Sequence, residues 1–445
     1  MQIGVQQTRV ATLVERMLTS ALAAVDPFEA VRRAVTRTST TLRVGKHRYD
    51  LDRYKRIFAV GAGKASAGMA AALEHRLGAR LTGGTVVVKY GHTTSTSVID
   101  VQEAGHPVPD AAGQRAAGQI LTLLNQLTAD DLVFVLLSGG ASSLLPAPAP
   151  GITLRDKQRT TALLLRSGAT IHDINAVRKH LSAMKGGRLA AATPARVIAL
   201  ILSDVLGDDL GTIGSGPTAP DGTTYGDAIQ ILRRYGIWKK VVPRVRAHLL
   251  NGQRGAYPES PKPGSHIFRR VQNQIIGNNQ AAVETVARVA KEGGLHTLIL
   301  TTSLQGEARE AAQWFGAMAR EILATGRPIR RPACLIAGGE LTVTVHGKGR
   351  GGRAQEFALA AAGELRGLPN VWTIGVGTDG TDGPTDAAGA IVDGQTLDRC
   401  ARLGVEPMDY LDRNDAYHLF KAVGGLIHTG PTGTNVNDLY LLIAL

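Results

Sequence analysis

A lysine in a glycine-rich turn is the feature of this chain that most directly suggests chemistry. Gly61, Gly63 and Lys64 follow the apolar run 57–60, and a helix-like stretch rich in alanine comes next. Glycines let backbone N–H groups approach a ligand closely, the start of a helix attracts anions, and the lysine adds a full positive charge. The turn therefore predicts a site that binds an anion.

Two well-known nucleotide-binding loops can be compared with this turn. The loop GxxxxGK[ST] needs a glycine where this chain has Phe58 and a hydroxyl where it has Ala65. The dinucleotide motif GxGxxG meets Ser66 in place of its third glycine, and the strand candidate 85–89 ends in Lys89 where an acidic residue is expected. Neither motif matches, and an ordinary strand-to-helix turn with a surface lysine stays open as an alternative.

A second basic glycine loop lies in the C-terminal half. Lys348, Arg350 and Arg353 alternate with glycines over residues 347–353, after the strand-like segment 341–345. The loop is short and leads into a strong helix former, unlike the long disordered RGG segments that bind nucleic acids. Two cationic loops with carboxylates between them suit phosphoryl transfer, because the transferred group spreads negative charge over its oxygens.

Polar residues follow most of the predicted strands at the point where the apolar run ends. In open parallel sheets this edge binds ligands. The residues are Ser138, Gly139, Gly140 and Ser142 after 131–137, Asp204 and Asp208 after 197–202, Asn278 and Asn279 after 274–276, Glu340 after 333–337, and Asp379, Asp382 and Asp386 after 372–376. The carboxylates suit Mg²⁺, whereas their spacing excludes an EF-hand. Each residue could also serve only as a helix cap or turn residue.

The elements that must position these residues alternate along the chain. Short apolar runs, which also include 297–301 and 439–444, are separated by longer stretches of helical period, and residues 8–38 read as a helix or helix pair. This pattern predicts an α/β fold with mostly parallel, Rossmann-like sheets. Since 445 residues exceed one ordinary core and residues 251–265 are rich in Pro, Gly and Ser, we expect domains at 1–260 and 261–445.

Composition narrows the class of protein. A hydrophobic content of 44% with 20% charged residues is typical of globular proteins, and no segment reads as a signal peptide or a membrane span. The net charge of +13 should attract anions, but only 4% of residues are aromatic and no basic stripe is visible, so a small anionic molecule is favoured over a nucleic acid. Cys334 and Cys400 cannot form a disulfide framework, which indicates a reducing cytoplasm.

Taken in order, the motifs resemble those of the class II, MOFRL-containing glycerate 2-kinases over nearly the whole chain. The resemblance is carried by residues 60–66, 105–109, 137–142, 175–182, 203–205, 215–218, 352–357 and 377–386. It implies two α/β domains with an active site in the cleft between them, and phosphorylation of the C2 hydroxyl of D-glycerate by ATP. It also implies that Lys64 and Arg353 are the catalytic cations.

The sequence hypothesis is therefore in-line transfer from MgATP to D-glycerate. Lys64 and Arg353 would stabilise the moving phosphoryl group, and Asp204 or Asp379 would orient the hydroxyl or help to hold Mg²⁺. The expected nucleotide-binding residues are Gly61, Gly63, Ser138, Gly139, Gly140, Ser142, Asn278, Asn279 and Glu340; the expected substrate-binding residues are Arg178, Lys179, Lys185 and Arg188; and the expected metal ligands are Asp379, Asp208 and Asp382.

Two other classes stay open at this point. Some relatives of this family are labelled hydroxypyruvate reductases, and Lys89 could accept the 2′-phosphate of a nicotinamide cofactor, although the failed GxGxxG motif speaks against one. A nucleic-acid binder is the third class, suggested only by the net charge. We expect no nucleic-acid or membrane partner, and the sequence leaves open whether the chain forms a homodimer.

Overall fold

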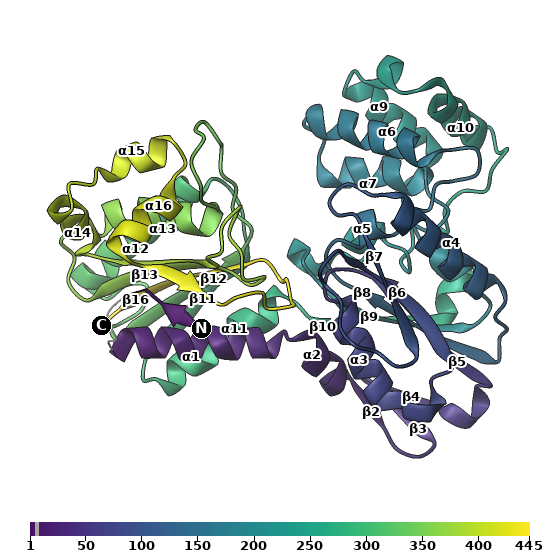
Figure 1. The fold of residues 1–445 in the computed structure, drawn as a ribbon, viewed down its shortest axis with the longest axis horizontal. Helices are drawn as coiled ribbons and strands as arrows, with labels where there is room; N and C mark the ends of the chain where they lie inside the picture. Colours follow the sequence, from purple (N-terminus) through teal and green to yellow (C-terminus); the bar gives the residue numbers. More distant parts are fainter. Residues whose placement is uncertain (5–8) are drawn as a thin grey trace. The chain divides into compact units, whose positions relative to one another are not determined.

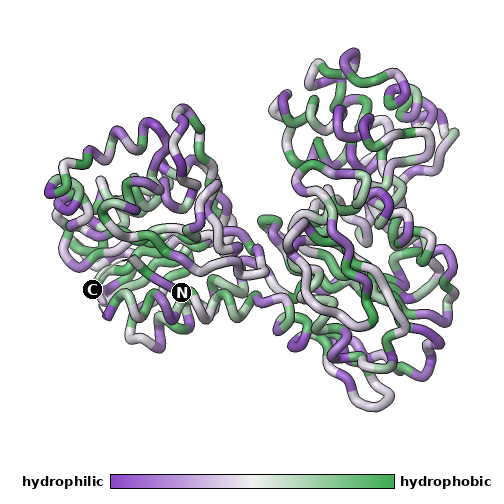
Figure 2. Tube along the Cα trace, in the orientation of Figure 1, coloured by the Kyte–Doolittle hydropathy of each residue, from purple (hydrophilic) through white to green (hydrophobic). Residues whose placement is uncertain are grey.

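The computed structural model describes residues 1–4 and 9–445 and divides the chain into two compact units (Figure 1). The central unit is Pro27–Ile276, and the terminal unit combines Met1–Asp26 with Gly277–Leu445. Figure 2 shows hydrophobic residues gathered along the strands in the middle of each unit. Each unit thus has a core of its own.

The central unit is built on a six-stranded sheet. Its strand order is β10 (Val271–Gly277), β9 (Arg196–Leu202), β8 (Asp131–Leu137), β5 (Arg56–Ala62), β6 (Gly83–Lys89) and β7 (Ile99–Ala104). The pairings from β9 through β7 are all parallel. Every residue of β8 is buried, as expected for a strand covered on both faces. Because these strands are parallel, the residues that follow β5, β8 and β9 meet at one edge of the sheet.

Helices cover this sheet and form a separate layer beyond the edge at which β5, β8 and β9 end (Figure 1). The sheet is flanked by α2 (Pro27–Ala34), α3 (Ser66–Leu77) and α4 (Ala111–Asn125), with the short α5 (Ala141–Leu144) and α8 (Arg188–Ala191), and a small sheet joins β2 (Val35–Arg37), β3 (Thr41–Val44) and β4 (His47–Asp50). The layer contains α6 (Leu154–Arg166), α7 (Ile171–His180), α9 (Tyr225–Arg234) and α10 (Pro243–Gln253), which share one apolar core.

The terminal unit holds a seven-stranded mixed sheet. Its order is β1 (Gln2–Ile3), β15 (Leu426–His428), β14 (Gly389–Asp393), β13 (Val371–Gly377), β16 (Asp438–Ala444), β12 (Ala333–Gly339) and β11 (His296–Leu304). Helices α1 (Arg9–Ala24) and α11 (Asn279–Glu292) cover one face, and α12 (Ala308–Thr325), α13 (Arg353–Glu364) and α16 (Ala416–Val423) cover the other (Figure 1). The short helices α14 (Thr396–Arg402) and α15 (Pro407–Asp412) complete the unit.

The structure confirms the α/β class and corrects its details. The six-stranded sheet is parallel where its pairings are described, whereas in the seven-stranded sheet only the pair β11–β12 is parallel. The other described pairs of that sheet, including both pairs that β16 makes between β12 and β13, are antiparallel. The predicted strand 341–345 forms only an isolated bridge from Thr342 to Glu307, because the Glu307 carboxylate and the Asn414 amide take up the backbone N–H groups of Thr344 and His346.

The boundary between the two units does not lie after residue 260, where the sequence predicted it. The chain leaves the central unit after Ile276, since β10 still belongs to the six-stranded sheet. The predicted helix pair 8–38 is present as α1 and α2 as far as Ala34, but residues 35–37 form β2 instead. Helix α1 packs on α11 in the terminal unit, and Thr8 lies outside the described residues. Among the described helices, none is long and apolar enough to cross a membrane.

Candidate active site

The turn that carries Lys64 connects β5 to α3. Its backbone amides are used inside the protein: the N–H groups of Gly63, Lys64 and Ala65 donate to the Val87 carbonyl, the Gly139 carbonyl and the Ser138 Oγ at 3.1, 2.8 and 3.0 Å. The expectation that these amides would bind an anion is therefore wrong. At this turn the charge on the lysine side chain is what attracts an anion.

The glycines of the turn are explained by the neighbouring strand. A Cβ on Gly61 would lie 2.0 Å from the Leu136 carbonyl oxygen, and a Cβ on Gly63 would lie 2.0 Å from Ser138 Oγ. Gly63 also has a φ of +144°, which only glycine adopts without strain. Gly61, Gly63 and Ser138 thus hold β5 against β8, which differs from their predicted role in nucleotide binding.

Cationic and imidazole side chains gather where β5, β6 and β7 end. Burial, Lys64, Lys89 and His92 together lower the pKa of His106 to about 4. His106 lies against Gly140, since a Cβ on that glycine would be 2.9 Å from the His106 Cδ2. The His106 imidazole is therefore neutral at neutral pH, and the two lysines make this edge of the sheet positive. Sequence reasoning quoted the motif around His106 but gave the residue no role.

Asp204 reaches the same edge from the end of β9. A Cβ on Gly139 would lie 2.2 Å from the Asp204 Oδ2, so this carboxylate packs directly on the glycine. The Gly139 carbonyl in turn accepts the N–H of Lys64. The structure thus brings together Lys64, Gly139 and Asp204, three residues that the sequence assigned to one site.

A chain of hydroxyl and amide groups continues from α5 into the helical layer. Ser142 Oγ lies 2.7 Å from Ser215 Oγ. The Ser215 hydroxyl donates a hydrogen bond to Asn175 Oδ1 at 3.0 Å. Ser215 is fully buried and has a φ of +62°, which is uncommon for a residue other than glycine. Lys185 lies beside this chain, because its Nζ donates to the Gly214 carbonyl at 3.2 Å.

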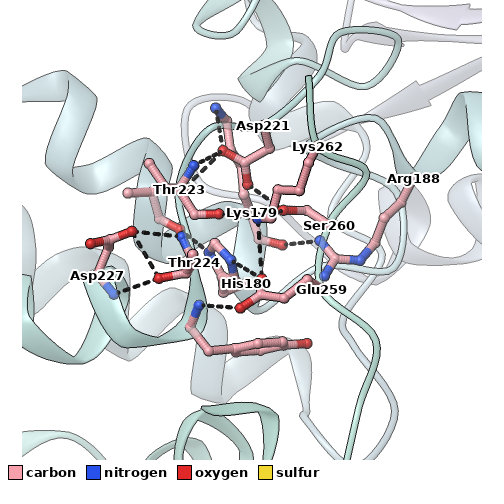
Figure 3. Close-up of polar contacts among 12 residues, drawn as sticks. Lys179, His180, Arg188, Asp221, Thr223, Thr224, Asp227, Glu259, Ser260 and Lys262 are labelled. Atoms are coloured by element: carbon pink, nitrogen blue, oxygen red, sulfur yellow. Dashed lines mark hydrogen bonds and ion pairs between the residues drawn. The ribbon is translucent and has the colours of Figure 1, made fainter. Parts of the chain in front are cut away.

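Two of the predicted substrate-binding cations have structural partners instead (Figure 3). Lys179 Nζ lies 3.3 Å from Asp221 Oδ1, and both side chains are buried. Arg188 Nη1 donates to the Lys179 carbonyl at 3.0 Å. With the His180–Glu259 contact at 3.2 Å, these bonds tie the end of α7 to neighbouring loops. Lys179 and Arg188 therefore stabilise the fold, whereas Arg178 and Lys185 stay candidates for substrate binding.

In the terminal unit, Arg353 begins α13 and is held by two carboxylates. Its Nε and Nη2 lie 2.5 and 3.1 Å from the two carboxylate oxygens of Asp438, and its Nη1 lies 2.6 Å from Glu340 Oε1. Burial raises the pKa of Asp438, and Arg353 opposes that rise. The guanidinium is fixed in orientation by the two carboxylates, and Glu340, although its side chain is 45% exposed, is paired with Arg353.

Asp382 caps the same helix. Its two carboxylate oxygens accept the N–H groups of Ala354 and Gln355 at 3.0 and 2.8 Å, and burial raises its pKa to about 7. A carboxylate used in this way differs from the predicted metal ligand. Within residues 1–4 and 9–445 no three His, Cys, Asp or Glu side chains are grouped as a metal site.

The remaining candidates serve mainly in caps and turns. Asn278 Oδ1 accepts the Ala281 N–H at 3.0 Å and caps α11, while Asn279 Nδ2 donates to the carbonyls of Val436 and Asp438 at 2.8 and 3.0 Å. Asp379 accepts the Thr381 N–H within its own loop, and Asp208 occupies a turn at a φ of +56°. Cys334 and Cys400 are both buried and unbridged, as expected.

Comparisons with known proteins agree with the motif order. Residues 13–250 match a domain of unknown function, DUF4147, and residues 333–438 match the MOFRL family. The chain is 43% identical over 429 residues, 96% of each chain, to a protein of Pyrococcus horikoshii named glycerate 2-kinase. It is 44% identical over 391 residues, 87% of each chain, to a putative hydroxypyruvate reductase of Agrobacterium vitis.

A solved structure supports the same assignment. The crystal structure of a Thermotoga maritima protein titled glycerate kinase superimposes with a TM-score of 0.87 at 42% identity, and the match covers 98% of this chain and 99% of that one. A similarity of this extent includes both units and the segments that carry Lys64, Asp204 and Arg353. The chain therefore belongs to the MOFRL-containing glycerate 2-kinase family of enzymes.

Proposed function

We propose that this protein is an ATP-dependent kinase that phosphorylates the C2 hydroxyl of D-glycerate and produces 2-phosphoglycerate. The observation that carries the proposal is the edge of the parallel sheet where Lys64 lies with Asp204 and Gly139, next to the positive surroundings of His106. Such an edge attracts a polyanion and offers a carboxylate beside it, which suits the transfer of a phosphoryl group to an alcohol.

The proposal gives these side chains separate roles. Lys64 stabilises the negative charge that spreads over the phosphoryl oxygens. In the terminal unit, Arg353 is the second catalytic cation that the resemblance to the family implies, and Asp438 and Glu340 fix the direction of its guanidinium. Asp204 accepts a hydrogen bond from the C2 hydroxyl and thereby orients it. Gly139 allows this arrangement, because any larger residue would displace the Asp204 carboxylate.

The carboxylates present fit a magnesium ion that arrives with the nucleotide. Mg²⁺ takes one or two protein carboxylates and completes its shell with waters and phosphates, so it does not require a cluster of three protein ligands. Asp204 in the central unit or Asp379 in the terminal unit would hold it, whereas Asp382 is used as a helix cap. When bound, the ion neutralises negative charge on the phosphate oxygens.

The alternative is a hydroxypyruvate reductase that uses NAD(P)H, in line with the name of the Agrobacterium vitis relative. The turn after β5 argues against it, since a pyrophosphate-binding loop presents its amides to the ligand, and these amides are bonded to Val87, Ser138 and Gly139. Lys89 lies beside His106 at the positive edge. Its charge does not decide between the two functions, because it would attract the phosphates of ATP as well as those of NADPH.

A pair of lysine variants tests the proposal. Lys64→Met should lower the turnover of ATP with D-glycerate by about 100-fold or more, the usual effect of removing one stabilising group from a transition state. Lys55→Met is the matched control, because Lys55 stands at the opposite end of β5, is exposed and pairs with Asp130. Oxidation of NAD(P)H by hydroxypyruvate, without ATP consumption, would show that the alternative is correct.

A further inference from the structure

The helical layer of the central unit holds two buried lysines and one partly buried arginine that have no carboxylate partner among the described residues. Lys157 comes from α6, Arg178 from α7 and Lys185 from the loop after α7. Lys157 and Lys185 are only 7% and 3% exposed. In the part of the chain that the structure describes, none of the ion pairs includes any of the three. Buried charges are normally paired, so this trio is unusual.

Three acidic residues of the surrounding helices and loops are committed elsewhere. Asp156 pairs with Arg244 at 3.2 Å and also accepts the N–H of Thr153, at the start of α6. The acid on the opposite end of α7, Asp173, pairs with Arg234 at 2.6 Å. Asp221 pairs with Lys179, the immediate neighbour of Arg178. Within the fold these carboxylates cannot neutralise the trio without breaking other bonds.

The two ammonium groups also have spare hydrogen-bonding capacity. Lys157 Nζ donates to the Ala147 carbonyl at 3.3 Å, and Lys185 Nζ donates to the Gly214 carbonyl at 3.2 Å. In the charged form, which a bound anion would favour, each ammonium group has three N–H donors, and the described residues provide one acceptor for each group. A ligand with two or more acceptor oxygens would fill the remaining donors of both lysines.

The three charges lie close enough to repel one another. Burial and Arg178 lower the pKa of Lys157 to about 7, and burial, Lys157 and Arg178 lower that of Lys185 well below its usual range. Burial also lowers the pKa of Arg178. An anion placed among them would offset the cost of holding these like charges away from water.

We propose that Lys157, Arg178 and Lys185 form a buried oxyanion site that holds the carboxylate of the hydroxy acid substrate. The assignment rests on the proposed function, which supplies a small hydroxy acid as the acceptor. Lys185 Nζ donates to the carbonyl of Gly214, the residue before Ser215. The Ser215 hydroxyl in turn contacts the hydroxyl of Ser142, which lies at the edge where the parallel strands end. The substrate carboxylate would thus lie at one end of a polar chain and its hydroxyl groups along it.

Sequence reasoning missed Lys157 because its helix begins with several charged residues that look like a solvated face. Arg155 and Arg159, on either side of it, are exposed, and only Lys157 turns into the layer. Arg159 therefore provides a matched control: it carries the same charge, lies on the same helix and stands outside the proposed site.

The first test measures ligand binding without turnover, as the shift in the melting temperature Tm of the whole protein. D-glycerate should raise the Tm of the wild type and of Arg159→Met, whereas glycerol, which lacks the carboxylate, should not. Lys157→Met should lose this shift. Without ligand, Lys157→Met should melt no lower than the wild type, because it removes a buried charge that has no ionic partner.

The second test separates the substrate from the nucleotide by kinetics. Lys157→Met should raise KM for D-glycerate by about tenfold or more, as expected when a hydrogen bond to a charged group is lost, and should leave KM for ATP within about twofold. Arg178→Gln is measured in the same way, so that poor folding of one variant does not prevent the test. Lys157→Arg, which keeps the charge, should recover part of the affinity.

Each outcome separates this proposal from the proposed function. An unchanged D-glycerate shift and KM in Lys157→Met and Arg178→Gln would overturn the site, even if the protein is a kinase. If the ATP shift is lost and the D-glycerate shift is kept, the trio binds phosphate and the assignment to the carboxylate is wrong. If D-glycerate shifts the Tm of the wild type but not of Lys157→Met and no phosphorylation occurs, the site stands and the kinase proposal fails.

Discussion

The Asp204 carboxylate packs on the Cα of Gly139 so closely that a Cβ there would stand 2.2 Å from Oδ2. Gly139→Ala should therefore push Asp204 out of place and lower kcat with D-glycerate at least tenfold, since small misplacements of a positioning group have large effects on rate. Steady-state kinetics on the purified variant measures this effect.

Gly118→Ala is the control for this substitution. Gly118 lies inside α4, and a Cβ on it would meet no atom within 4 Å. This change should leave kcat unaltered and stabilise the protein by about 0.5–1 kcal/mol, because alanine loses less conformational freedom in a helix. Wild-type kcat in Gly139→Ala would show that the position of Asp204 does not matter for turnover.

The pKa of His106 reports on the charge that surrounds it. Burial and then Lys64 hold it at about 4, so we expect Lys64→Met to raise it towards its ordinary value of 6.5 without reaching it. NMR titration of the imidazole C–H signals follows the change, and Lys55→Met should leave it unaltered. A pKa that stays at about 4 in Lys64→Met would place the lysine charge away from His106.

The same shift makes stability depend on pH. Below pH 6.5 the imidazole of the unfolded chain takes up a proton, whereas His106 in the fold takes one up only near pH 4. The unfolded state therefore binds more protons in this window, and the free energy of unfolding should fall as pH drops from 6.5 to 4. His106→Gln should make that fall shallower in urea titrations at several pH values.

Lys179 tests the distinction between a charge used in folding and one used in binding. Lys179→Met leaves the buried Asp221 carboxylate without its cation, and we expect a loss of about 3 kcal/mol in the free energy of unfolding. KM for D-glycerate, measured at a temperature where the variant is folded, should stay within about twofold. A large rise in KM with unchanged stability would restore the substrate-binding role that the sequence suggested.

Arg353 differs from Lys179, because we expect its removal to lower both stability and activity. Arg353→Gln should lower the free energy of unfolding by about 3 kcal/mol, since the Asp438 side chain that it leaves behind is only 4% exposed. Glu340→Gln should cost less than about 1 kcal/mol, because Glu340 is 45% exposed. Urea unfolding of the two variants measures both values. Equal losses of free energy in the two variants would mean that the buried contact with Asp438 stabilises the protein no more than the exposed contact with Glu340.

Local sequence patterns predicted the elements well where burial alone decides the structure. The apolar run 131–137 became the fully buried β8, and the residues after β5, β8 and β9 do meet at one edge. The direction of β16 was not predictable from its own residues, because a strand buried on both faces looks the same in a parallel or an antiparallel sheet. The resemblance to a family, rather than any single motif, predicted the activity.

The roles of individual polar residues were harder to predict, because they depend on partners that are distant in the sequence. Gly61 and Gly63 read as a phosphate-binding turn, yet each is required by a contact with β8. The sequence around Lys179 and Lys185 does not show that the two lysines have different roles. In the structure, Lys179 pairs with the buried Asp221 carboxylate, and Lys185 does not. Nothing in the sequence indicated that Lys157 is buried, because its burial depends on how α6 packs against the other helices of the layer.

The identity of the product tests the central claim most directly. The wild-type protein is incubated with D-glycerate, ATP and Mg²⁺, and the reaction is followed by ³¹P NMR. The account predicts a new phosphomonoester signal split into a doublet by the single hydrogen on C2, together with one ADP for each ester formed. A triplet, from phosphorylation of the CH₂OH group, would contradict the assignment to C2, and the absence of any ester would contradict the kinase itself.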